Sequence, residues 1–145
     1  MWKSILAVFV AIILLAIFAK RDDGSVMVHF YDQNIREKKL ECLSYTLFPQ
    51  NSAMEKRLKK LYSFKETCSY RLDITYKDGI HCNSAQNAAR QAVGDFPNAY
   101  MKIELRRGLD LLYSYYRDLK NPATADDLEE GFERVSSDLK LSGTK

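Results

Sequence analysis

The sequence predicts an α+β architecture: a single N-terminal transmembrane helix, then a small domain with about four short strands and one helix, followed by two to three C-terminal helices. Three observations support this. Residues 5–19 contain no polar side chain, residues 26–82 hold segments of alternating apolar and polar residues, and apolar residues recur at helical spacing from about residue 84. We therefore expect a membrane anchor over residues 1–23, with its helix at about 4–19, and a single domain over residues 24–145.

The apolar run is short for a membrane span, because a helix rises 1.5 Å per residue and needs about 20 apolar residues to cross the bilayer. Lys3 and Lys20 flank the run and can extend to the headgroups, and Trp2 suits a membrane interface. The alternative is a cleaved signal peptide. A single lysine before the run and a bulky Phe18 near its end favour the uncleaved anchor in contact with the lipid bilayer.

The charges beside the run nearly balance, with Lys3 before it and Lys20 and Arg21 after it. Positive charge alone therefore does not set the orientation. Because long C-terminal domains translocate largely regardless of charge, we expect a single-pass protein of the bacterial inner membrane with its domain in the periplasm.

Strands are predicted where apolar and polar residues alternate. The first covers residues 26–31 and the second runs over 40–48, where Pro49 closes it. The clearest alternation spans residues 68–76, and an Asp-Gly turn then leads to a short return strand over 80–82.

Helices are predicted where capping residues precede apolar residues at helical spacing. Asn51 or Ser52 caps the first, an alanine-rich helix covers 85–93, and a long helix spans about 97–120. Thr124 then begins a Thr-x-x-Asp sequence that resembles a capping box and opens the last helix. The apolar face of the long helix comprises Leu105, Leu109, Leu112, Tyr115, Tyr116 and Leu119.

The chain has three cysteines, and an odd number in an oxidising compartment leaves one thiol over. The expected hairpin separates Cys68 from Cys82, which disfavours that pair. Cys42 and Cys68 each lie early in a predicted strand, and a crossover helix can bring those strands together. We expect a Cys42–Cys68 disulfide first and Cys42–Cys82 second, with three buried free thiols as the alternative.

No catalytic, cofactor-binding or metal-binding signature is found. His81 and Cys82 are neighbours in a predicted strand and so point to opposite faces, which excludes a local pair. A pairing of His29 with Cys68 or with Cys82 stays open, because sequence spacing does not test it. The cysteines, histidines and acids lack the short repeated spacings of a metal site, and the six glycines form no phosphate-binding loop. A net charge of +3 argues against nucleic-acid binding.

Tyrosine offers the clearest hint of a partner surface, since the chain contains nine. On the predicted long helix, Ile103 falls on the polar face and Tyr113 at its boundary, close to Tyr116. Exposed aromatic and apolar residues of this kind are typical of protein interfaces. The alternative is that they pack beneath the last helix.

These observations together predict a membrane-anchored, non-enzymatic accessory or assembly subunit of a bacterial envelope complex. It would act through protein–protein interaction of its periplasmic domain with other membrane or periplasmic proteins. One alternative is an exported soluble binding or enzymatic domain released by signal cleavage. Another is a cytoplasm-facing, membrane-tethered regulator with reduced thiols.

Overall fold

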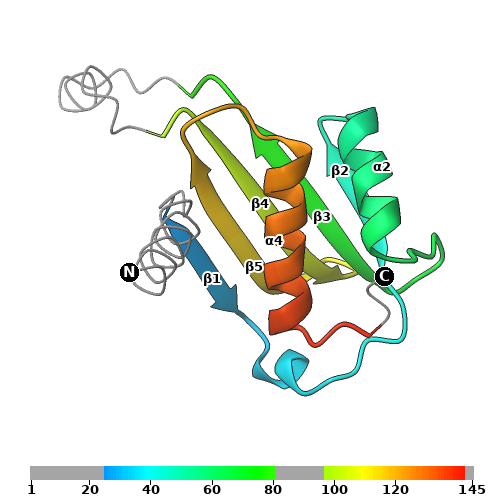
Figure 1. Cartoon of the computed structure of the whole chain (residues 1–145). Coiled ribbons are helices and arrows are strands. Elements are labelled where there is room, and N and C mark those ends of the chain that lie inside the picture. Colours follow the sequence, from blue (N-terminus) through cyan, green and yellow to red (C-terminus); the bar gives the residue numbers. More distant parts are fainter. Residues whose placement is uncertain (1–24, 81–96, 143–145) are drawn as a thin grey trace, which may run out of the picture.

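A five-stranded sheet with two helices packed on one face forms the domain (Figure 1). The computed structural model describes residues 25–80 and 97–142, and the expected anchor helix over 4–19 lies outside them. None of the helices within these two ranges has the length and apolar character that a membrane crossing requires. The elements are β1 (Val26–Phe30), a short 3-10 helix η1 (Gln33–Arg36), β2 (Ser44–Phe48), α2 (Ser52–Leu61), β3 (Tyr70–Lys77), β4 (Ala99–Arg107), β5 (Asp110–Leu119) and α4 (Ala125–Asp138).

The strand order is β1-β5-β4-β3-β2. Strands β2 and β3 are parallel and are joined through α2, whereas β3, β4, β5 and β1 pair antiparallel. Parallel neighbours need such a crossover, and antiparallel neighbours can be joined by tight turns. Strands β1 and β2 are therefore the two edges of the sheet, with the other three strands between them.

Four expected elements are confirmed with small changes in their bounds, and the first of them is the strand expected over residues 26–31, which is β1. The side chain of Asn51 accepts hydrogen bonds from the N–H groups of Ala53 and Met54 and so caps α2. At the start of α4, Thr124 and Asp127 form the reciprocal capping box. The alternating segment around residues 70–77 is strand β3.

The long helix expected over residues 97–120 is wrong, because this segment forms the β4–β5 hairpin. The C-terminal part of the described chain therefore holds one helix, α4, where two to three were expected, and the described strands number five. Leu109, assigned to the apolar helical face, lies in the turn with 96% of its surface exposed. Gly108 supplies the positive φ of 62° that this turn uses.

Side-chain alternation explains why the hairpin is preferred. In β4, Met101, Ile103 and Leu105 are buried on the helix-covered face, and Lys102 and Glu104 point to the opposite face. The same segment as a helix would place Ile103 among charged residues. The apolar set is therefore fully buried only as a strand.

Two other expectations differ in extent or lie outside the described residues. The second strand begins at Ser44, not at residue 40. Leu40 and Leu43 belong to the segment that precedes the strand, where both side chains are buried in the core. The alanine-rich helix expected over 85–93 falls within residues 81–96, which the structure does not describe, as does most of the return strand over 80–82.

Candidate functional site

The residues expected to form a partner surface do not share one face. Ile103 and Tyr113 have no exposed surface, because both lie on the sheet face beneath α4. Tyr116 is half-buried on the opposite face, where its ring stacks on Tyr100 with centroids 5.5 Å apart. Neighbouring residues of a strand point to opposite faces, which separates Tyr116 from its two expected companions.

The interior position of Tyr113 also explains its chemistry. Its hydroxyl donates a hydrogen bond to Asp138 Oδ2 at 2.9 Å, and its ring meets Phe30 edge-on. Burial, together with the hydrogen bond to the Asp138 carboxylate, holds the pKa of Tyr113 well above the usual range. The hydroxyl is therefore a fixed donor within the fold.

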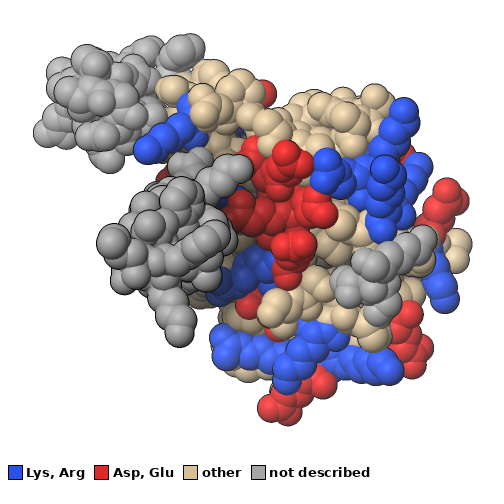
Figure 2. All heavy atoms as spheres, viewed as in Figure 1, with Lys and Arg blue, Asp and Glu red and all other residues tan. Residues whose placement is uncertain are grey.

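The acidic residues of α4 contact cations of the same domain. Figure 2 shows acidic side chains in the middle of this face, beside basic side chains over α2. Arg57 of α2 pairs with Asp126, at 3.1 Å, and with Glu129. The buried Arg117 of β5 pairs with Glu130 at 2.7 Å. These contacts hold α4 against α2 and against the sheet.

A disulfide joins Cys42 to Cys68, with an S–S distance of 2.01 Å and Cα atoms 5.9 Å apart. This is the pairing that the sequence favoured first. It links the segment before β2 to the segment before β3, and so fixes the chain that leaves α2 beside the start of β2. Lys65 N–H donates to the Leu43 carbonyl at 2.8 Å in the same place.

A large hollow lies where β2, α2 and the segment that follows α2 meet. It has a volume of about 950 Å³ and is bounded by residues 44–47 of β2, by Glu55 and Lys59 of α2, by residues 62–66, and by Arg71 of β3. We call it the β2 groove. Ligand sites in proteins have volumes of about 300–1,000 Å³, so the groove is large enough for several side chains of a partner.

Aromatic rings form the floor of the β2 groove. The ring of Phe64 lies 4.7 Å from that of Tyr45 and 5.0 Å from that of Tyr62, measured between centroids. Phe64 also packs near Phe132 of α4, at 6.1 Å, which connects the floor to the core. The floor is thus apolar, well packed and partly exposed, which is the character of residues that dominate binding energy at interfaces.

The rim of the groove is polar. Glu55 accepts hydrogen bonds from Lys59 Nζ at 2.8 Å and from the Tyr45 hydroxyl at 3.0 Å. The hydrogen bonds from Lys59 and Tyr45 lower the pKa of Glu55, and burial raises the pKa of Tyr45. The carboxylate therefore stays ionised and orients the tyrosine ring along the groove.

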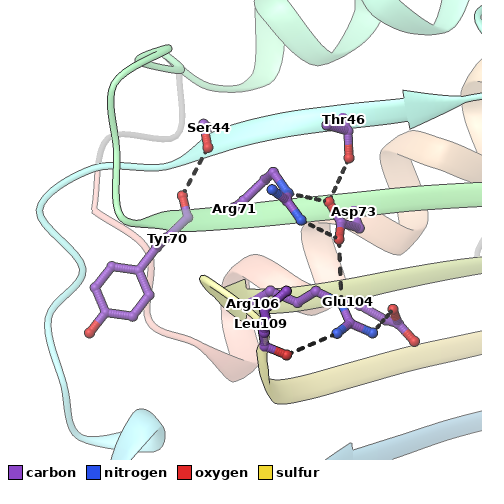
Figure 3. A network of polar contacts seen from close by, with 8 residues as sticks. All are labelled: Ser44, Thr46, Tyr70, Arg71, Asp73, Glu104, Arg106 and Leu109. Carbon is purple, nitrogen blue, oxygen red and sulfur yellow. Dashed lines mark hydrogen bonds and ion pairs between the residues drawn. The ribbon is translucent and has the colours of Figure 1, made fainter.

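Along its other side, the groove continues into a polar network on the open face of the sheet (Figure 3). Asp73 accepts from Thr46 Oγ1 at 2.5 Å and from Arg71 Nε at 2.6 Å, and Arg106 Nε lies 3.4 Å away. Arg106 also donates to Glu104 at 2.9 Å. The network ties β2, β3 and β4 together and immobilises the guanidinium of Arg71 at the groove.

The open-face carboxylates are not poised for proton transfer. Burial raises the pKa of Asp73, but hydrogen bonds from Arg71 and Thr46 outweigh it and lower the pKa below its ordinary value. The pKa of Glu104 is lowered in the same way by Lys102 and Arg106, against the effect of burial. Both groups are therefore fixed anions near neutral pH, whereas a general base works best with a pKa near the working pH.

The remaining candidates for chemistry are dispersed. His29 lies on β1 with its ring 4.4 Å from that of Tyr31, and both His81 and Cys82 lie outside the described residues. Within residues 25–80 and 97–142 no three His, Cys, Asp or Glu side chains are grouped as a metal site would need. Among the described residues, the β2 groove with its aromatic floor and polar rim is therefore the better candidate for a functional site.

Sequence reasoning missed this groove, although one signal for it was present. Tyr62 and Phe64 are large aromatic residues just after the helix that ends at Leu61, and an apolar pair past a helix end often packs against a neighbouring element.

Comparisons of this chain with protein-family models, with curated proteins and with solved structures found no match.

Proposed function

We propose that this protein is a non-enzymatic accessory or assembly subunit of a bacterial envelope complex. The apolar segment 5–19 tethers it to the inner membrane, and the folded domain lies in the periplasm and binds another protein. The β2 groove receives a loop or an extended segment of that partner. The observation that carries the proposal is the aromatic floor of Tyr45, Tyr62 and Phe64 in a groove of about 950 Å³.

The chemistry of the groove favours a protein partner. Aromatic residues are enriched in protein interfaces, and a polar rim provides hydrogen bonds around them. Glu55, Lys59 and Arg71 are held in place by their own hydrogen bonds, so a partner would not have to order them on binding. The carboxylates near the groove are fixed anions, which fits recognition better than acid–base catalysis.

The Cys42–Cys68 disulfide supports the periplasmic location. Disulfides persist in oxidising compartments, including the bacterial periplasm, and are rare in the cytosol. A cytoplasm-facing regulator would keep these thiols reduced. An exported domain released by signal cleavage shares the oxidising location and differs only in losing the tether.

Site-specific photo-crosslinking tests the groove. A photo-crosslinking amino acid in place of Ser63, which is exposed and lines the groove, should give an adduct of defined mass with one protein in intact cells. The matched control is the same amino acid in place of Lys60, which is exposed on α2 outside the groove.

Either of two results would contradict the proposal: no protein adduct from the groove position, or equal adducts from the groove and the control. Alkaline phosphatase fused after Lys145 tests the location separately. Activity in a full-length, membrane-bound fusion is expected. An active but soluble, shortened product would favour the released domain.

A further inference from the structure

Strand β1 forms the edge of the sheet opposite the β2 groove, and in the described parts of the chain one side of its backbone has no neighbouring strand. Tyr31 N–H donates to the Leu112 carbonyl at 2.9 Å, and the Ser25 carbonyl accepts from Asp118 N–H at 3.2 Å. Backbone groups of a strand alternate in direction, so those of Val26 and Val28 point away from β5. Among the described residues no strand pairs with this outer side.

Strand β1 itself carries none of the sequence features that usually protect an edge. Its sequence, Val-Met-Val-His-Phe, contains no charged residue and no proline, and its pairing with β5 is regular, without a bulge. Met27 is 59% exposed. Because natural proteins commonly place lysine, proline or a bulge at a free edge, an unprotected one is suited to strand addition.

A second hollow, of about 480 Å³, adjoins this edge between β1, η1 and the end of α4. The half-buried side chains of Val28 and Phe30 form its apolar floor. Its rim carries three cations, Arg36, Arg134 and Lys140, and one carboxylate, Asp138. We call the outer edge of β1 and this hollow together the β1 groove.

The rim has an excess of positive charge. Arg134 Nε is 3.1 Å from Asp138 Oδ1, and Asp138 also accepts from the Tyr113 hydroxyl, so this carboxylate is already engaged. The guanidinium of Arg36 lies 3.9 Å from the centre of the Phe30 ring, directly over the apolar floor. Arg36 and Lys140 are therefore the cations in excess at this rim.

The backbone conformation at Lys140 also supports a role for its positive charge. Leu141 N–H donates to the Ser136 carbonyl at 3.0 Å, and Lys140 has a φ of 51°, which together describe a helix C-terminal motif that usually places glycine at this residue. Lysine is less favourable than glycine in this backbone conformation. Its presence is therefore better explained by its charge than by the turn.

We propose that the β1 groove binds an extended, acidic segment of a partner protein, which adds to the sheet as a further strand beside β1. Backbone hydrogen bonds to Val26 and Val28 supply the pairing. On the helix-covered face, an apolar side chain of the segment packs on Val28 and Phe30, and an acidic one pairs with Arg36 and Lys140. This surface lies on the sheet edge opposite the β2 groove and does not depend on it.

A labelled synthetic peptide tests the proposal on the full-length chain in detergent micelles. The probe has Glu, Val and Glu at alternate positions separated by Thr, and its binding is measured by fluorescence anisotropy. Lys140→Gly removes one cation and suits the local backbone, so the fold is retained. Arg36→Gln removes the other. Lys56→Gln, on the exposed side of α2, is the matched control.

We expect each groove variant to weaken binding about three- to fivefold, and the double variant about tenfold, the size typical of partly exposed ion pairs. Lys56→Gln should leave the affinity unchanged. A probe methylated on alternate backbone nitrogens, or one with Gln for Glu, should bind at least tenfold more weakly, since these changes remove the strand pairing or the charge.

Three results would overturn the proposal: no binding of the probe, equal binding of the methylated probe, or affinity unchanged by the double variant. Self-association of the full-length chain that the double variant abolishes, measured by sedimentation before any peptide is added, would also overturn it and assign the edge to a second copy of this chain.

Discussion

Removal of the Cys42–Cys68 disulfide should destabilise the domain strongly. The double variant Cys42→Ala/Cys68→Ala takes away the disulfide crosslink between the segment before β2 and the segment before β3. These segments border the β2 groove, which consequently loses a constraint on residues 62–66. The same change therefore bears on both the stability of the fold and the shape of the proposed binding surface.

The magnitude follows from the length of the loop that the bond closes. The two cysteines are 26 residues apart in sequence. A crosslink restricts the unfolded chain, and the loop-closure entropy for this separation corresponds to about 3.5 kcal/mol at 25 °C. A domain of this size is typically stable by about 5–15 kcal/mol, so the loss takes a large part of the total.

Urea unfolding followed by pulse proteolysis measures this difference on the full-length chain. Ser69→Ala, at an exposed position next to Cys68, is the matched control and should leave the unfolding midpoint unchanged. Wild type treated with a reductant should unfold at the same urea concentration as the double variant. The double variant itself should not respond to reductant.

A loss of stability below about 1 kcal/mol in the double variant would refute the loop-closure reasoning. A second result would also refute it: the double variant remains less stable than wild type by the same amount when both proteins are reduced. In that case the destabilisation would come from the alanine side chains and not from the crosslink.

Three further predictions follow from the packing and the charges. Leu109→Asp should change the unfolding free energy by less than about 0.5 kcal/mol in urea titrations, because Leu109 is 96% exposed in the β4–β5 turn, and a large loss would contradict the hairpin. Glu130→Ala should cost about 1–2 kcal/mol by the same assay, since it removes the 2.7 Å contact to the buried Arg117; an unchanged midpoint would show that this contact adds nothing. The lowered pKa values of Asp73 and Glu104 mean that the unfolded state binds more protons in acid, so their stabilisation is present above the ordinary values of 3.8 and 4.5 and is lost as the pH falls through the folded pKa values. Thermal unfolding of Asp73→Asn should accordingly show a weaker dependence on pH between about 5 and 2 than wild type does. An identical dependence would contradict the role of the network.

The elements that sequence analysis located correctly are those with strong local determinants. Asn51 and Thr124 mark helix starts because their side chains bond the first free N–H groups of their own helices. Strand β3 follows from strict alternation over residues 70–77. Each of these signals lies within a few residues of the structure that it specifies.

The hairpin over residues 99–119 shows where local reasoning fails. Leucine and tyrosine recur there at spacings that fit a helix as well as two strands joined by a turn. The choice is made by the neighbours: β3 pairs with β4 and β1 pairs with β5, so that backbone groups on both sides of the hairpin are satisfied. The misassigned partner surface of Ile103 and Tyr113 followed from the same error.

The sequence by itself determined the apolar N-terminal segment, the helix caps and the alternating strand, since each depends on residues that are adjacent along the chain. Only the tertiary structure decided which sheet face is covered and where the grooves lie. The β2 groove joins residues 44–47 to residues 62–66, and the β1 groove joins Phe30 to Lys140. Such surfaces form where segments that are distant in sequence pack together. The spacing of these segments along the chain does not predict that they will be in contact.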